Sequence, residues 1–322
     1  MCTSQITSGA KTDTPCAPPV MLGAGIISGA RLGSLTIGSS RSLRSLGTSV
    51  SCASGRPLAK RYDNMKETEK LLDDLAEEID PHIETISKFL ENLKETDKPL
   101  SIFSTTSFIP KIESLRIGIF ELAKIEEYYS LNILFRSSIE QFLKFQYLWM
   151  KTVENNNDEI GIDYWVFGGQ QEKIDYAKAL SQTYKMLGIS SIKSALQTLQ
   201  DLGIISNESS ASQIKKRTEQ FTYKSMTFYI SEKTNKGESL PILNAVLPRY
   251  SELSSCVHGG PESAFTFSES GIKEAIEFST FASLYTRYLS WVLMAQYEKD
   301  IFPACHIVKK YLDKYLKSSC AM

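Results

Sequence analysis

The stretch 111-KIESLRIGIFELAKIEEYYSLNILFRSSIEQFLKFQYLWMKTV-153 has the pattern of an α-helix along almost its whole length. In its second half, apolar residues recur at steps of three and four, at Phe135, Ile139, Phe142, Phe145 and Trp149. This spacing places them on one face of a helix, as expected of a helix that packs against a core. Because the stretch is longer than most helices of globular proteins, we expect a bend or an interruption near residues 129–130.

Similar periodicity continues on both sides of this stretch. It predicts further helices at 64–95, 171–187, 190–201, 241–260, 269–300 and 304–317, and a polar helix within 203–220. We expect Pro81 to kink or divide the first of these, because proline removes a backbone donor and clashes with the preceding turn. Residues 97–110, which have prolines near both ends, and residues 154–161 are predicted to be loops. Residues 221–230 fit either a strand or a buried helix.

The order of these elements predicts the fold class. The chain shows no alternation of strand and helix patterns and no internal repeat of 20 to 50 residues. Both a doubly wound sheet and a solenoid are therefore excluded. We predict an all-α, multi-helix bundle.

Residues 1–61 differ in composition from the rest of the chain. They are rich in Ser and Gly, as in 33-GSLTIGSSRSLRSLGTS-49, and contain a single acidic residue. Such a segment buries too little apolar surface to offset the entropy that ordering would cost. We predict a disordered Ser/Gly/Arg-rich leader at 1–61, which translation from Met65 would skip, and a single helical domain at 62–322. A cleaved transit peptide and a secretory signal with its apolar region at 20–30 are the alternatives.

Charge is distributed unevenly along the chain, whose formal net charge is −1. The leader holds seven Lys or Arg against one acid, which leaves 29 basic and 36 acidic residues, a net charge of −7, on the remainder. A net charge this negative on residues 62–322 does not fit a protein that binds duplex DNA over a broad surface, although it allows a local basic groove.

Cysteine usage and hydropathy indicate the compartment. Six cysteines without a C-x-x-C pair do not form a disulfide framework for a chain of this size, so we expect a reducing environment. The most apolar long window, 275–297, contains Glu277 and Arg287, whose charges would be costly in lipid. We therefore predict a core helix at 275–297 rather than a membrane span, and a cytoplasmic protein.

Two short segments carry the candidate functional residues. In the first, Asn132, Arg136, Glu140 and Lys144 are spaced by four and form one stripe along a helix. The stripe is either a solvated face with an ion pair or a partly enclosed Arg–Glu pair that orients or recognises another group.

The second segment is 249-RYSELSSCVHGGP-261, which contains one of the three histidines of the chain. The Gly-Gly-Pro that follows His258 is a strong helix stop, so His258 lies in the last turn of a helix. There the helix dipole favours the imidazolium form. His258 either caps the helix or performs acid–base chemistry. A zinc site with Cys256, Cys305 and His306 is disfavoured, because the spacing is not that of a closed site.

Taken together, the two segments resemble a known family. An R-S-x-x-E helix in 136-RSSIEQFLKFQYL-148, followed by Y-x-x-L-S-x-x-V-H-G in 250-YSELSSCVHG-259, is similar to the bacterial helical family catalogued as domain of unknown function 5677. The resemblance covers roughly residues 65–300 and implies an all-helical architecture and a site, not a reaction. The site residues that it implies are Arg136, Glu140, Tyr250, Ser254 and His258.

More distantly, the chain is similar to the HEPN group of helical domains, many of which are metal-independent ribonucleases. In that group an Arg is followed after four to six residues by a His at a helix end. The His acts as acid or base on RNA, and the Arg stabilises phosphorane charge. Here the nearest upstream arginine, Arg249, precedes His258 by nine residues, which puts the two on opposite faces of a continuous helix. The resemblance thus implies His258 with Arg249 after a kink near 254–255, or with Arg136 from the other helix.

These observations leave three functions. We expect a non-enzymatic binding protein, a sensor or adaptor of a bacterial defence or stress system, because histidine is scarce and P-loop, kinase and H-E-x-x-H motifs are absent. The first alternative is a HEPN-like metal-independent ribonuclease that uses His258 with Arg136 or Arg249, in a cleft formed across a homodimer. The second is a small-ligand-binding bundle, lined by the aromatic residues of 142–149 and gated by Glu140. The expected partners are RNA, a second copy or another protein, without a cofactor, a metal or a membrane.

Overall fold

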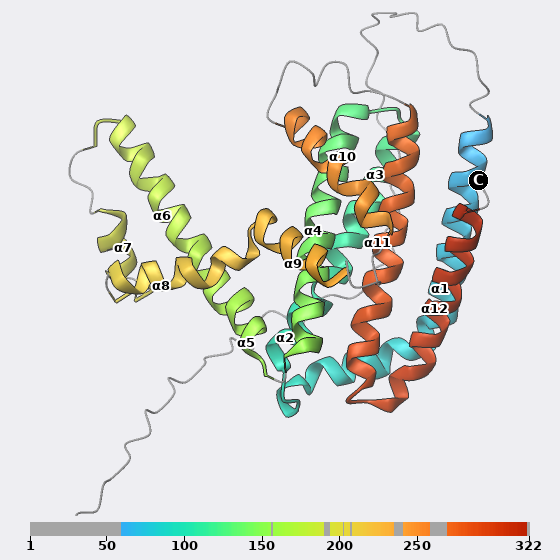
Figure 1. Ribbon diagram of the computed structural model, residues 1–322, viewed down its shortest axis with the longest axis horizontal. Helices are drawn as coiled ribbons and strands as arrows, with labels where there is room; N and C mark the ends of the chain where they lie inside the picture. Colours follow the sequence, from blue (N-terminus) through green and yellow to red (C-terminus); the bar gives the residue numbers. More distant parts are fainter. Residues whose placement is uncertain are drawn as a thin grey trace, which may run out of the picture. The chain divides into compact units, whose positions relative to one another are not determined.

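The computed structural model describes residues 59–155, 157–189, 194–201, 203–206, 208–234, 241–257 and 269–320. Within these ranges every regular element is helical, which confirms the predicted all-α class (Figure 1). The helices are α1 (Ala59–Glu91), α2 (Pro99–Thr106), α3 (Phe108–Lys124), α4 (Tyr128–Glu154), α5 (Glu159–Ile162), α6 (Gly168–Met186), α7 (Ala195–Asp201), α8 (Glu208–Thr218), α9 (Tyr223–Thr234), α10 (Pro241–Val257), α11 (Glu269–Ala295) and α12 (Phe302–Cys320). Short 3₁₀ turns lie at Leu93–Glu95, Glu219–Phe221 and Lys299–Ile301, and a π-helical turn, Asp163–Phe167, joins α5 to α6.

All of these helices belong to one compact unit, residues 56–322. The predicted leader lies outside the described residues, apart from residues 59–61, which begin α1. Among the described residues, no helix is long and apolar enough to cross a membrane. The window 275–297 lies mostly within α11 and contributes buried residues to the core, as predicted.

Helix α4 is the central element of the bundle, because α3, α11, α10, α9 and α2 all pack against it (Figure 1). Its apolar face is fully buried at Phe135, Phe142 and Phe145. The Phe142 ring meets the ring of Phe278 on α11 edge to face, at a centroid separation of 5.5 Å. It also lies 5.9 Å from the ring of Phe281. Such aromatic pairs add to the stabilisation that burial of the rings already provides.

Helices α1 and α12 lie side by side and cover α11 (Figure 1). Glu78 of α1 accepts hydrogen bonds from Lys310 at 2.7 Å and from the Tyr311 hydroxyl at 2.7 Å, both on α12. Helix α1 continues through Pro81, so of the two effects predicted for this proline, a kink or a division, the division is wrong.

The predicted loop at 97–110 is also wrong, because these residues form α2 and the start of α3. Pro99 is the first residue of α2 and Pro110 the third residue of α3. The first turn of a helix tolerates proline, since its backbone N–H groups have no partner inside the helix. At α2 the free N–H groups of Leu100 and Ser101 instead donate to the Asp158 carboxylate, at 2.9 and 2.7 Å.

The interruption expected near residues 129–130 lies a few residues earlier, between the end of α3 at Lys124 and the start of α4 at Tyr128. Glu126 takes a left-handed conformation there, with φ of 57°. The Glu127 side chain then caps α4 by accepting from the Ser130 N–H. Residues 223–230, left open between strand and helix, are helical within α9.

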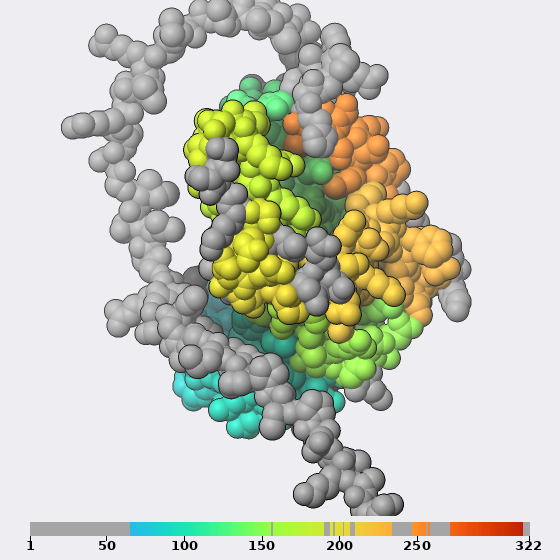
Figure 2. Space-filling view, turned by 90° about the vertical axis from the view of Figure 1, so that its left-hand side faces the viewer, coloured from blue at the N-terminus to red at the C-terminus, as the bar shows by residue number. Residues whose placement is uncertain are grey.

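Helices α6, α7 and α8, which we call the arm, have a small core of their own. It consists of Ile174, Ala177, Leu199, Ile205 and Ile214. Helix α6 ends at Met186 and is followed by Gly188 with φ of 70°, at the stop that the sequence predicts. Figure 2 shows the arm from its outer side, in yellow-green and yellow, beside the orange residues of α10.

Gly161 of α5 lies very close to the backbone of α2. Its N–H donates to the Ser101 hydroxyl at 3.1 Å, and a Cβ at this position would lie 2.2 Å from the Ser101 backbone nitrogen. We therefore expect Gly161→Ala to lower the free energy of unfolding by about 1–3 kcal/mol or more, since backbone has to move. Gly169→Ala is the matched control, because a Cβ there meets nothing within 4 Å. It should change the free energy by less than about 1 kcal/mol. Urea unfolding of both variants tests this, and equal stability would contradict it.

Candidate functional site

Arg136 connects α4 to α10. Its Nε donates to the Ser254 hydroxyl at 3.0 Å, and its Nη2 donates to the Tyr250 hydroxyl at 3.1 Å. The guanidinium carbon also lies 5.0 Å from the centroid of the Tyr250 ring, within cation–π range. The structure thus brings together three of the residues in the two sequence segments, although more than a hundred positions separate them along the chain.

Glu140 lies between two cations of α4. Its Oε1 accepts from Lys144 Nζ at 2.9 Å, whereas its Oε2 is 3.7 Å from Arg136 Nη1. The three side chains are between 21% and 28% exposed, so the stripe is neither fully solvated nor enclosed. Asn132, which begins the stripe, is buried.

A pair of tyrosines completes the surroundings of Arg136. The ring of Tyr223 on α9 stacks on the ring of Tyr250 at a centroid distance of 4.2 Å and an interplanar angle of 11°. Burial raises the pKa of Tyr223, and the neighbouring Tyr250 raises it further. We call this set of half-buried residues the Arg136 cluster: Arg136, Glu140, Lys144, Tyr223, Tyr250 and Ser254. The sequence offered no sign of Tyr223, because its position depends on α9 packing beside α10.

Arg249 is not part of this cluster. It is paired with Glu252 on its own helix, and its Nε lies 3.4 Å from Oε2 of Glu274 on α11. Burial raises the pKa of Glu274, while Arg249 acts in the opposite direction. His258 lies outside the described residues, so neither arginine can be placed relative to it. The described residues contain no group of three or more His, Cys, Asp or Glu that could hold a metal ion.

The aromatic residues of 142–149 form core contacts. The rings of Phe142 and Phe145 lie 6.3 Å apart, and Phe145 also contacts Phe108. Trp149 is partly buried and donates its indole N–H to the Leu289 carbonyl at 3.1 Å. These side chains fill the space between α4, α3 and α11, so they line no enclosed ligand site that the structure describes.

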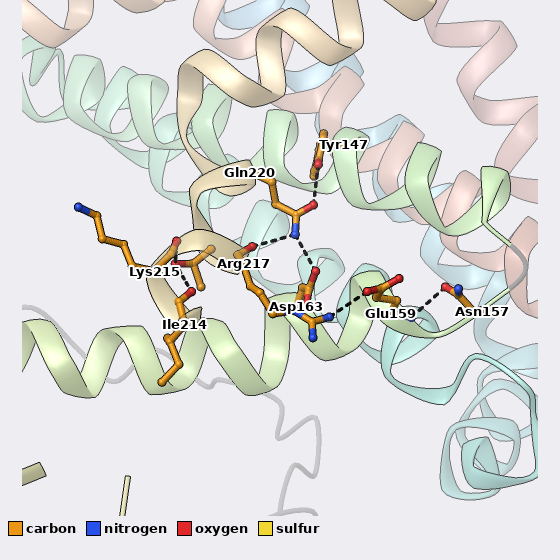
Figure 3. A network of polar contacts seen from close by, with 9 residues as sticks. Tyr147, Asn157, Glu159, Asp163, Ile214, Lys215, Arg217 and Gln220 are labelled. Atoms are coloured by element: carbon orange, nitrogen blue, oxygen red, sulfur yellow. Dashed lines mark hydrogen bonds and ion pairs between the residues drawn. The ribbon is translucent and has the colours of Figure 1, made fainter. Parts of the chain in front are cut away.

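A second polar network, which the sequence did not indicate, joins α4 to the arm (Figure 3). The Tyr147 hydroxyl donates to Gln220 Oε1 at 3.0 Å, and Gln220 Nε2 donates to Asp163 Oδ2 at 2.7 Å. Arg217 is ion-paired with Asp163 at 2.5 Å and with Glu159 at 3.1 Å. The buried Asp163 interrupts an otherwise apolar run at 160–167, and this interruption is the one signal that could have identified it.

The chemistry of this network favours a structural role. Burial raises the pKa of Tyr147 to about 12, and the charge of Asp163 contributes to the increase. Tyr147 is therefore a neutral hydrogen-bond donor at physiological pH. Asp163 Oδ1 is ion-paired with Arg217 and Oδ2 accepts from Gln220, so each oxygen of this carboxylate has a partner within the network.

Comparisons of the chain with protein-family models, with curated proteins and with solved structures found no match.

The contact between Arg136 and Ser254 can be measured by a double-mutant cycle. We expect Arg136→Gln to lower the free energy of unfolding by about 1.5–3 kcal/mol, because it removes hydrogen bonds to a charged group. Combined with Ser254→Ala, it should show a coupling energy of about 0.5–3 kcal/mol. Ser137→Ala is the control partner, since its hydroxyl bonds the Ile133 carbonyl within α4. In urea unfolding, the effects of Arg136→Gln and Ser137→Ala should be additive, whereas those of Arg136→Gln and Ser254→Ala should not. If Arg136→Gln were additive with both serine substitutions, the contact between Arg136 and Ser254 would be contradicted.

The raised pKa of Tyr147 predicts a dependence of stability on alkaline pH. Because folding raises this pKa from 10.0 to about 12, the contribution of neutral Tyr147 to the free energy of unfolding is fully present below pH 10 and is lost as the pH rises toward 12. Tyr147→Phe should reduce the loss of unfolding free energy over this pH range by up to about 2 kcal/mol. The remaining loss comes from other tyrosines, such as Tyr164. Tyr176→Phe alters an exposed side chain and is the control. Unfolding free energies at pH 9 to 12 test this, and equal slopes for Tyr147→Phe and wild type would refute it.

Proposed function

We propose that the protein is a non-catalytic binding protein, a sensor or adaptor of a bacterial defence or stress system, that recognises an anionic ligand through the Arg136 cluster. The observation that carries this proposal is that two cations, Arg136 and Lys144, share the single carboxylate of Glu140. The assignment to a defence or stress system rests on the resemblance of the two sequence segments alone.

The geometry supports recognition of an anion. Lys144 lies in direct contact with Glu140, whereas the 3.7 Å separation leaves Arg136 Nη1 without a close hydrogen-bond partner. Ser254 and Tyr250 meanwhile hold the guanidinium in one orientation. A planar guanidinium held in this way is suited to bind a carboxylate or a phosphate through paired hydrogen bonds. An anionic group would balance the net positive charge of the cluster.

The same contacts argue against catalysis within the cluster. Its carboxylate and its amine, Glu140 and Lys144, are paired with each other. The groups that touch Arg136 on α10 are hydroxyls without a neighbouring base among the described residues. General acid–base catalysis needs a group that is free to accept or donate a proton at the reacting atom.

One observation favours a metal-independent ribonuclease as a second candidate. Arg136 contacts α10 at Ser254, and His258 follows Ser254 by four residues in the sequence. Arg136 rather than Arg249, which is paired with Glu252 and Glu274, would then supply the charge that stabilises the transition state.

A single set of proteins separates the two candidates. The full chain is compared with four variants: Arg136→Gln, Lys144→Met, His258→Ala and Lys88→Met. Each protein is incubated in EDTA with ATP or with a short single-stranded RNA. The unfolding temperature of the protein and the length of the RNA are then measured. Lys88 is the control, because it is an exposed lysine paired with Glu84. We expect at least one probe to raise the unfolding temperature by about 2–4 °C, as for roughly 1 kcal/mol of binding energy.

The binding function predicts that the shift is lost in the Arg136 and Lys144 variants, is kept in the Lys88 variant, and leaves the RNA intact. RNA cleavage by the wild type that is lost in His258→Ala would contradict the binding function and support the ribonuclease. If no probe raises the unfolding temperature and no RNA is cleaved, recognition of an anion by this cluster is overturned.

A further inference from the structure

The arm is attached to the rest of the chain through two short turns. The π-helical turn Asp163–Phe167 leads into α6, and the 3₁₀ turn Glu219–Phe221 leads from α8 into α9. The small apolar core of the arm is separate from the large core of the bundle. Within the described part of the chain, the arm packs against the other helices mainly at these two turns, which we call the base of the arm. The contacts within the base therefore determine how the arm is held.

Hydrogen bonds of Gln220 hold the base together (Figure 3). Its Nε2 donates to Oδ2 of Asp163 in the π-helical turn at 2.7 Å, and to the Arg217 carbonyl at 2.8 Å. Its Oε1 accepts from the Tyr147 hydroxyl of α4 at 3.0 Å. Arg217 is in turn ion-paired with Asp163. Gln220 thus joins both turns of the base to α4.

The 3₁₀ turn that contains Gln220 continues directly into the Arg136 cluster. The ring of Phe221 meets the ring of Tyr147 edge to face, at a centroid distance of 5.9 Å. Two residues later, Tyr223 begins α9 and stacks on Tyr250. The Tyr250 hydroxyl accepts from Arg136. The base and the guanidinium are therefore linked by a short, continuous path of contacts, which is the kind of path that can carry energetic coupling between two sites.

We propose, on the basis of the function proposed above, that Gln220 is a positioning residue for the Arg136 cluster. It holds the start of α9 so that Tyr223 stacks on Tyr250, and Tyr250 then orients Arg136. The affinity of the cluster for its anionic ligand is thereby coupled to the attachment of the arm. Because coupling between two sites is reciprocal, a change at either one affects the other.

A substitution of Gln220 distinguishes positioning from a purely structural role. Gln220→Leu keeps a side chain of similar size and removes the hydrogen bonds to Tyr147 and Asp163. A structural role predicts a loss of stability alone, whereas a positioning role predicts weaker ligand binding as well. Gln197→Leu is the matched control, because Gln197 is an exposed residue of α7 whose side chain donates to Asp201 on the same helix.

Calorimetric titration measures the effect on the ligand. ATP and a short single-stranded RNA are each titrated into the full chain, the Gln220→Leu variant and the Gln197→Leu variant. We expect Gln220→Leu to weaken, by about fivefold or more, the binding of a probe that the wild type binds, as is typical of coupling between two sites. Gln197→Leu should keep the wild-type affinity.

Hydrogen exchange measures the same coupling from the other end, without a ligand. Arg136→Gln should speed the exchange of backbone amides in the arm several-fold, because a loosened tyrosine pair lets the base open more often. Arg136 itself contacts α4 and α10 rather than the arm. Ser137→Ala is the control, since its hydroxyl bonds the Ile133 carbonyl within α4, and it should leave these rates unchanged.

Two results would each overturn the proposal. The first is a wild-type affinity in Gln220→Leu, which would mean that buried residues of α9 such as Met226 hold this helix without help from the base. The second is a wild-type rate of exchange in the arm of Arg136→Gln. If neither probe binds the wild type, the proposed function fails, and the exchange experiment alone decides the coupling. If Gln220→Leu fails to fold, Tyr147→Phe, which removes one hydrogen bond of Gln220, replaces it in the titration with the same expected direction.

Discussion

Helix α4 must bury an aromatic face and still carry a row of charged residues on the remaining surface, and the arrangement of the other helices follows from this constraint. Phe135, Phe142 and Phe145 are fully buried, and their rings contact aromatic residues of α11 and α3. Burial of rings this large supplies much of the free energy available to a helical core. Helices α3 and α11 are therefore held against α4, and α10 and α9 cover the side from which Arg136 extends.

Charge is balanced differently at two places on this framework. In the Arg136 cluster, two cations face one carboxylate, and all three side chains are partly removed from water. In the network around Asp163, Arg217 faces two carboxylates, and Gln220 and Tyr147 continue the hydrogen bonding to α4. An excess of positive charge that is partly removed from water favours an anionic partner. This difference separates the structural network from the Arg136 cluster, where we infer binding.

Sequence periodicity predicted most helices because the alternation of apolar and polar residues is a local property. It could not place the prolines of 97–110 correctly. Whether Pro99 ends a loop or begins a helix depends on Asp158, which supplies the N-terminal acceptors of α2 from a position 58 residues away. The stripe from Asn132 to Lys144 was visible for the same local reason. That Arg136 turns toward Tyr250 and Ser254, and that Arg249 turns away toward Glu274, depends on how α10 is rotated against α4 and α11.

The sequence by itself determined the helical class, the positions of most helices and the residues of α4 and α10 worth testing, because each of these follows from spacing along one helix. The tertiary structure alone decided which charges meet. Tyr223 joins Tyr250, Ser283 reaches Glu113, and Gln220 connects Tyr147 to Asp163 only after the aromatic core has set the helices side by side.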